Sequence, residues 1–274
     1  MSKGKLSAFF AALLIASVAA TFIATRSFAL QTPPADNEHQ TGAVLWYQTA
    51  AENRALAYQA FELAKLRLDA QLKPCKKSRK KLPCAIVTDV DETILDNSPN
   101  QAFLIKNRRS FNPTDWQNWC NLEAAKPLPG AIEFFNYAVN KGFKPFYVTN
   151  RDAAQKTVTG NNLRKAGFPD VTDETLMVRA DTSSKEARRQ AIAQKYRIVM
   201  LLGDNLNDFA QAFERKSIAD RSAAVDAAKA DFGSRFIMLP NPMYGDWESA
   251  IYDYNFKRTE EAKAVIRQTL LQSY

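Results

Sequence analysis

The feature that most constrains the fold is a short apolar run, residues 85–88, which ends directly in two acidic residues, Asp89 and Asp91. Pro83 bounds the run on one side and the acids bound it on the other, a pattern typical of a fully buried strand. Open α/β sheets bind their ligands at the carboxyl ends of their strands. We therefore expect Asp89 and Asp91 to lie where the chemistry of this molecule takes place.

The rest of the chain alternates between predicted strands and predicted helices. Further strands are predicted over residues 144–148, 175–178, 197–202 and 236–239, and helices over 131–139, 153–165, 184–195 and 259–271. This alternation predicts an α/β fold, with a Rossmann-like, doubly wound and mostly parallel sheet. Two largely helical stretches, about 43–72 and 98–128, are predicted to supply a smaller cap or flap, and Pro74 is predicted to end the first of them.

The first 29 residues have the pattern of an export signal. Two lysines precede an uncharged run over residues 6–25, and Ser27-Phe28-Ala29 is a small-x-small cleavage site. An uncleaved anchor is the alternative, because about 20 residues suffice to span a bilayer. The Ala, Ser and Thr content of the run favours cleavage. We expect a periplasmic or secreted protein without a stable membrane anchor, consisting of a linker over 30–42 and one domain over 43–274.

Much of the formal net charge of +8 comes from one basic run over residues 73–81. Because no aromatic residue is interleaved and prolines interrupt both ends, we interpret the run as a solvated loop and expect no nucleic-acid partner. Cys75 and Cys84 bracket this run. In an exported protein they could form a disulfide, and the sequence leaves that pairing open.

Carboxylates also follow the strand predicted over residues 197–202, where Asp204 and Asp208 occur. Together with Asp89 they would form a hard oxygen site suited to Mg²⁺, which binds one or two carboxylates and keeps waters and phosphate oxygens as its other ligands. A calcium loop beginning at Asp89 is excluded. It would need glycine at position 94 and glutamate at position 100, and the chain has Ile94 and Asn100.

The residue types near these acids suit phosphoryl chemistry. Thr149 follows a predicted strand and offers a neutral hydroxyl, and Lys185 offers a point positive charge; both match the oxygens of a phosphoryl group. Asp89 can act as a nucleophile, because an aspartyl-phosphate splits hydrolysis into two easier steps. Asp91 lies on the same side of an extended chain, so it would protonate the leaving oxygen and later deprotonate water.

The order of these residues resembles the four motifs of the haloacid dehalogenase (HAD) superfamily of phosphohydrolases. Longer segments resemble bacterial class C acid phosphatases, the outer-membrane 5′-nucleotidase lipoprotein family. The first set comprises Asp89-Val90-Asp91-Glu92-Thr93, Thr149, Lys185 and Gly203-Asp204 with Asp208. The second comprises Leu95-Asp96-Asn97-Ser98-Pro99, Lys126-Pro127-Leu128-Pro129-Gly130-Ala131, Phe146-Tyr147-Val148-Thr149-Asn150-Arg151, Gly203-Asp204-Asn205-Leu206-Asn207-Asp208-Phe209, Leu239-Pro240-Asn241 and Tyr244-Gly245-Asp246-Trp247.

This resemblance implies a Mg²⁺-dependent phosphomonoesterase. It implies that Asp89, the Asp91 carbonyl and Asp204 bind the metal and that Asp208 acts just outside the metal shell. It further implies nucleoside 5′-monophosphates as small-molecule substrates. The residues assigned to substrate binding are Phe103 and Tyr244, whose rings would hold the base, together with Asn150 and Arg151 after Thr149.

The chain departs from the family pattern in two ways. Its first cysteine is Cys75, so it has no cysteine at which a lipid could anchor its N-terminus, and Phe103 stands where relatives carry Trp. Cys120 is predicted to be a buried thiol, because cysteine phosphatases require an arginine six residues later and this chain has Lys126. Asp96 and Asn97 are predicted to be turn residues.

Other functions stay open at this point. A phosphotransferase would pass the phosphoryl group to a nucleoside and not to water. A non-catalytic binding protein on the same fold is disfavoured, because all four motif aspartates are present. The single histidine, His39, lies in the predicted linker, so a histidine nucleophile and a zinc site of several histidines are excluded. A homo-oligomer is one of the assemblies that the sequence allows.

Overall fold

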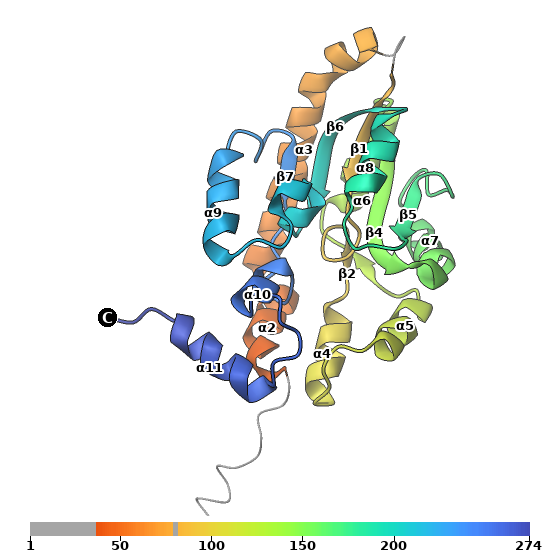
Figure 1. Ribbon diagram of the computed structural model, residues 1–274. Helices are drawn as coiled ribbons and strands as arrows, with labels where there is room; N and C mark the ends of the chain where they lie inside the picture. The colour runs from red at the N-terminus through yellow and green to blue at the C-terminus, as the bar shows by residue number, and fades with distance from the viewer. Residues whose placement is uncertain (1–36, 79–81) are drawn as a thin grey trace, which may run out of the picture.

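The computed structural model describes residues 37–78 and 82–274. Its centre is a five-stranded sheet with the order β5-β4-β1-β6-β7, in which every pair of neighbours is parallel. The strands are β1 (Cys84–Thr88), β4 (Lys144–Asp152), β5 (Leu176–Arg179), β6 (Arg197–Gly203) and β7 (Phe236–Met238). The predicted parallel sheet is therefore confirmed (Figure 1).

Helices cover both faces of this sheet. One face packs against α3 (Ala51–Ser78), α6 (Ala131–Asn140) and α7 (Lys156–Ala166). The other packs against α8 (Glu186–Ala193) and α9 (Ile218–Ala227). The sheet is thus doubly wound, as predicted, although α9 was not among the predicted helices.

The β1 strand lies in the middle of the sheet because its side chains serve both faces. Cys84 and Ile86 belong to the hydrophobic core on one face, and Ala85 and Val87 belong to the core on the other. All five residues of β1 are buried. Alternate residues of a strand point to opposite faces, so only an apolar run can occupy such a position.

Short helices gather at the carboxyl end of the sheet, in the lower part of Figure 1. They include α4 (Ser98–Lys106) and α5 (Pro113–Asn121), which lie within the stretch 98–128 where a flap is predicted. The others are α2 (Thr41–Thr49), α10 (Asp246–Ile251) and α11 (Glu260–Leu270). Smaller elements complete the fold: β2 (Leu95–Asp96), β3 (Lys126–Pro127), and the 3₁₀ helices η1 (Glu38–Gln40), η2 (Ala153–Gln155), η3 (Leu206–Asp208) and η4 (Gln211–Phe213).

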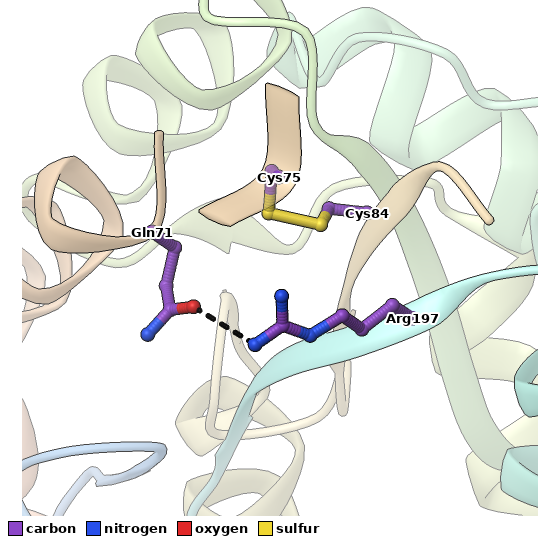
Figure 2. The surroundings of a disulfide bond; sticks show 4 residues. All are labelled: Gln71, Cys75, Cys84 and Arg197. Atoms are coloured by element: carbon purple, nitrogen blue, oxygen red, sulfur yellow. Dashed lines mark hydrogen bonds between the residues drawn. A yellow bond between two sulfur atoms is a disulfide. The ribbon is translucent and has the colours of Figure 1, made fainter. Parts of the chain in front are cut away.

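The prediction that Pro74 ends its helix is wrong, because α3 continues to Ser78. A proline removes one backbone hydrogen bond, and here covalent and polar contacts hold the turn around it. Cys75 forms a disulfide with Cys84 at the start of β1 (Figure 2). Arg197, at the start of β6, donates to the Gln71 side chain at 3.5 Å. The long helix also packs on the face of the sheet, so most of the first predicted cap stretch belongs to the core.

The predicted signal peptide over 1–29 lies outside the described residues, as does most of the predicted linker over 30–42. Helical turns begin at Glu38, so the end of that linker stretch is folded. Across residues 37–78 and 82–274, no helix is both long enough and apolar enough to cross a bilayer.

Candidate active site

Three adjacent strands bring the predicted catalytic residues to one edge of the sheet. Asp89 follows β1, Thr149 lies in the carboxyl-terminal half of β4, and Asp204 follows β6. Because β1 lies between β4 and β6, these side chains meet. Lys185 occupies the N-cap position of α8, which places its ammonium group at the same edge.

Three carboxylates form the floor of this site. Asp89, Asp204 and Asp208 each offer an oxygen that lies within 4.8 Å of the other two. The Lys185 ammonium donates hydrogen bonds to Oδ1 of Asp89 and to Oδ1 of Asp208, the latter at 2.6 Å. The Lys185, Asp89 and Asp208 side chains are nearly fully buried. We call Asp89, Asp204 and Asp208 the carboxylate trio.

Further donors fix the remaining oxygens of the trio. The Thr93 hydroxyl lies 3.1 Å from Asp89 Oδ2 and 2.9 Å from Asp204 Oδ1, so it has one proton to share between them. Asn241 donates to Asp204 Oδ2 at 2.8 Å. The backbone N–H of Asn205 donates to Asp208 Oδ2 at 3.0 Å. Each carboxylate therefore has a fixed orientation.

The glycine at position 203 lets Asp208 fold back onto this turn. A side-chain carbon at position 203 would overlap with Cβ of Asp208 and lie 2.6 Å from its Oδ2. Only a residue without a Cβ leaves that space open. The sequence Gly203-Asp204 is thus required by packing as well as by chemistry.

Burial and repulsion from neighbouring carboxylates make Asp89 and Asp204 costly to ionise. Burial raises the pKa of Asp89 to about 7, and the charges of Asp208 and Asp91 act in the same direction, while Lys185 opposes them. Burial, followed by the charges of Asp208 and Asp89, also raises the pKa of Asp204 well above its usual value. Three carboxylates against one ammonium group leave two negative charges uncompensated when all are ionised.

These residues fit a divalent cation. The donors are carboxylate oxygens, which hard ions such as Mg²⁺ prefer, and a charge of +2 would balance the two uncompensated negative charges. A bound cation would also lower the raised pKa of Asp89, so that the carboxylate needed for attack is available at neutral and mildly acidic pH.

The second predicted catalytic acid, Asp91, has different neighbours. Its Oδ2 accepts a hydrogen bond from the Thr149 hydroxyl at 3.0 Å. Its Oδ1 accepts from Asn97 Nδ2 and from Arg151 Nε, both at 2.9 Å. Asp91 is partly exposed, whereas Arg151 and Asn97 are buried. The predicted turn residue Asn97 is therefore a buried contact of the site.

A cavity of about 1010 Å³ opens beside the carboxyl edge of the sheet. It reaches Asn150, Asn205 and Asn207, which adjoin Thr149, Asp204 and Asp208 in the sequence. Tyr244 lines the cavity and donates its hydroxyl proton to buried Glu92. The substrate-binding role predicted for Asn150 and Tyr244 is compatible with these positions.

Two other predicted substrate contacts are placed differently. Phe103 is 42% exposed but does not line this cavity. The Arg151 side chain is buried and does not line the cavity either. Phe111 and Trp116 provide aromatic rings on the cavity wall, with centroids 6.5 Å apart. Neither was predicted as a substrate contact, because Phe111 is one exposed ring outside a helix or strand and Trp116 is one partly buried ring on α5, and neither pattern shows what the ring faces.

Sequence reasoning also missed polar residues that orient the site. Arg188 donates to the Thr149 carbonyl and to Asn150 Oδ1, both at 2.6 Å. In the sequence, the only indication that Arg188 belongs to the site is its position about one helical turn after Lys185. Thr93 and Asn241 lie in segments that carry the family resemblance, so their presence was visible although their contacts were not.

The buried thiol predicted at position 120 is confirmed. Cys120 is free and 2% exposed. Burial raises its pKa to about 11, so little of the thiolate form is available. A nucleophilic role for Cys120 therefore finds no support.

The fold and sequence match solved structures from Bacillus anthracis. Its class C acid phosphatase is 43% identical, with a TM-score of 0.83 over 88% of this chain and 99% of that chain. The same phosphatase with tungstate bound is 44% identical, with a TM-score of 0.81 over 87% and 98% of the two chains.

More distant relatives come from plants. The Stem 31 kDa glycoprotein of Glycine max is 30% identical over 161 residues, and Acid phosphatase 1 of Solanum lycopersicum is 29% identical over 164 residues. The matches cover 57% of each of these proteins, so the chain spans just over half of their length. The sequence model of a protein family, the acid phosphatases of HAD subfamily IIIB, matches residues 5–247 of this chain. With most of its length matched by that model, this chain belongs to subfamily IIIB of the HAD superfamily, the acid phosphatases.

Proposed function

We propose that this protein is an exported, Mg²⁺-dependent acid phosphatase that hydrolyses nucleoside 5′-monophosphates through an aspartyl-phosphate. The observation that carries the proposal is the position of Asp89. It is a buried carboxylate at the end of the central strand, held by Lys185 and surrounded by two further carboxylates. Such an arrangement suits a nucleophile that works beside a divalent cation.

The residues of the chain divide the reaction between them. The Asp89 carboxylate attacks phosphorus, and the bond to the leaving oxygen breaks as Asp91 transfers a proton to that oxygen. Asp91 then removes a proton from water, which attacks the aspartyl-phosphate and releases inorganic phosphate. Lys185 and the Thr149 hydroxyl would hold the phosphoryl oxygens. A bound Mg²⁺, held by Asp89, Asp204 and the Asp91 carbonyl with Asp208 behind them, would neutralise charge on the transferring group.

The walls of the cavity support a nucleotide substrate. They combine aromatic rings with amide side chains, which suit the flat face and the polar edge of a nucleobase. The contributing residues include Gln101, Phe111, Trp116, Asn150, Asn207 and Tyr244. A sugar phosphate would leave much of this apolar wall in contact with water.

Two features support export. The pattern of residues 1–29 is that of a cleaved signal peptide. The Cys75–Cys84 disulfide is the kind of bond that persists in oxidising compartments such as the periplasm.

The proposal is tested by measuring phosphate release from nucleoside 5′-monophosphates, sugar phosphates and aryl phosphates, with Mg²⁺ or with a chelator. We expect the highest kcat/KM for nucleotides and loss of activity with the chelator. Free nucleoside added as an acceptor should not divert the phosphoryl group from water; efficient transfer to it would identify a phosphotransferase. Binding without turnover of any substrate would refute the enzymatic assignment.

A further inference from the structure

We propose that Arg151 and Asn97 are positioning residues for Asp91, and that they fix which Asp91 oxygen exchanges the proton. The inference rests on the proposed phosphomonoesterase function, because it explains how that reaction uses its acid. It replaces substrate binding as the role of Arg151.

The two carboxylate oxygens of Asp91 have unlike surroundings. Oδ1 accepts two hydrogen bonds, from Asn97 Nδ2 and from Arg151 Nε, both at 2.9 Å, and lies 2.8 Å from Arg151 Nη2 in the ion pair. Within residues 37–78 and 82–274, Oδ2 has one hydrogen-bond partner, the Thr149 hydroxyl at 3.0 Å. A carboxylate oxygen offers about two lone-pair directions, so Oδ1 is saturated and Oδ2 is not.

This difference assigns the proton. An oxygen that already accepts two hydrogen bonds and lies against a guanidinium charge has no lone pair for a proton, so protonated Asp91 carries its hydrogen on Oδ2. The Oδ2–H bond then breaks as the proton passes to the leaving alkoxide of the substrate, and Oδ2 later accepts a proton from the attacking water. Oδ1 stays bound to Arg151 throughout and holds the carboxyl group at a fixed rotation.

The surroundings of Arg151 indicate that it positions Asp91 and does not contact the substrate. Its side chain is 1% exposed. Beyond Asp91, its Nη1 donates to Thr159 Oγ1 at 3.2 Å and its Nη2 donates to Asn97 Oδ1 at 3.2 Å. Its guanidinium lies 5.2 Å from the ring centroid of Trp116, a cavity-lining residue. At this burial the guanidinium offers almost no surface to a substrate.

Asn97 is held just as firmly. Its Oδ1 accepts from Arg151 and from the indole N–H of Trp119, the latter at 2.8 Å, while its Nδ2 donates to Asp91. The amide can therefore adopt only one of its two flipped orientations. Asn97 and Arg151 are 54 positions apart in the sequence, so the network ties the loop after β2 to the end of β4.

Precise placement matters because proton transfer is sensitive to small displacements. General acid catalysis contributes about 10²- to 10⁴-fold, and a shift of about 1 Å can cost about 10²-fold. Loss of the network should therefore lower the rate only for substrates whose leaving group needs a proton. A nucleotide releases a basic alkoxide, whereas an activated aryl phosphate releases a stable phenolate.

The test compares kcat/KM for a nucleoside 5′-monophosphate and for an activated aryl phosphate, because kcat/KM reports the step in which the leaving group departs. The variants are Arg151→Lys, Arg151→Met and the milder Trp119→Phe, which removes the indole N–H together with one ring of the indole and leaves Arg151 and Asn97 in place. We expect Arg151→Met to lose about 30- to 100-fold on the nucleotide and less than about threefold on the aryl phosphate. Trp119→Phe should lose a few-fold on the nucleotide alone.

Arg221→Met is the matched control. Arg221 is also buried and is paired with Asp246 at 2.7 Å, on α9 and α10. This variant should change both substrates by the same factor. Equal losses on both substrates in the Arg151 variants would overturn the inference, and so would a rise in KM with unchanged kcat, which would restore substrate binding as the role of Arg151.

A double-mutant cycle separates this inference from the function on which it rests. If Arg151 acts through Asp91, adding Arg151→Met to Asp91→Asn should cost less than about threefold more on the nucleotide. A full additional loss would contradict the inference while leaving the phosphatase intact. Absence of turnover of both substrates by the unmodified protein would instead refute the proposed function itself.

Discussion

The two ends of the β1 strand have opposite properties. At its start, Cys84 is tied by a disulfide to the last turn of α3. Just past its other end, Asp89 lies in a buried trio of carboxylates that repel one another. One strand of five residues thus leads from a covalent support to a cluster of like charges.

The contrast shows where stability and chemistry are kept apart. A disulfide stabilises the native chain chiefly by restricting the unfolded chain, so it can lie far from the reacting groups. Buried like charges cost folding free energy, and they persist where the surrounding structure holds them and a function needs them. We therefore expect changes at the two ends of β1 to affect different measurements.

The largest effect is expected from Asp89→Asn. An amide is a poor nucleophile, so kcat/KM for phosphate release should fall by at least about 10⁴-fold. The free energy of unfolding should stay the same or rise, because one charge is removed from the trio. Activity assays and chemical denaturation check the two halves. Substantial residual turnover, or an unfolded variant, would show that activity and stability are not divided between the two ends of β1.

Removal of the divalent ion should give the next largest effect. Dialysis against a chelator is expected to lower phosphate release by more than about a hundredfold, because the trio would then carry uncompensated charge. Adding Mg²⁺ should restore it, and Ca²⁺ should restore it less well, because the larger ion favours more oxygen ligands. Full activity of the chelated protein would contradict a metal-assisted reaction.

The opposite pattern is expected at the start of β1. Replacing both bridging cysteines, as Cys75→Ser with Cys84→Ser, should lower the free energy of unfolding by about 2.5 kcal/mol for so short a loop. At a temperature where the variant stays folded, its kcat/KM should remain within about twofold of the original, because the change lies away from the catalytic edge. A large loss of activity in the folded variant would mean that the two ends are coupled.

A smaller effect is expected from pH on the free energy of unfolding of the protein from which a chelator has removed the metal. The pKa of Asp89 is about 7 in the folded state against 3.8 as its usual value, so the folded state binds more protons between these limits. The free energy of unfolding should therefore rise as the pH falls from about 8 to about 5. Asp89→Asn should flatten this trend, as should saturating Mg²⁺. A fall in stability over this range would show that the carboxylates are not strained.

The catalytic edge was predictable because it depends on local signals. Asp89 and Asp204 each follow an apolar strand and Thr149 lies in the carboxyl-terminal half of another. Parallel strands end at one edge, so their meeting follows from the alternation of strands and helices. The sequence left the Cys75–Cys84 pairing undecided, because loop length alone does not determine whether a disulfide forms.

What could not be predicted depends on contacts between distant residues. Asn97 has the residue type of a turn, and its role arises only when Arg151 and Trp119 converge on it. Pro74 has a strong tendency to end a helix, which the surrounding tertiary contacts override. The cavity wall was missed for the same reason, since Phe111 and Trp116 come together on it only after α5 has packed against α4 and α7.

The most direct test of the central claim is to trap the aspartyl-phosphate. The protein is mixed with a nucleoside 5′-monophosphate and Mg²⁺, quenched in acid within one turnover and digested for mass spectrometry. We expect one added phosphoryl group on the peptide that contains Asp89, at that residue, and none in Asp89→Asn. A phosphoryl group on another residue, or turnover with no trapped intermediate under conditions that slow its hydrolysis, would contradict Asp89 as the nucleophile.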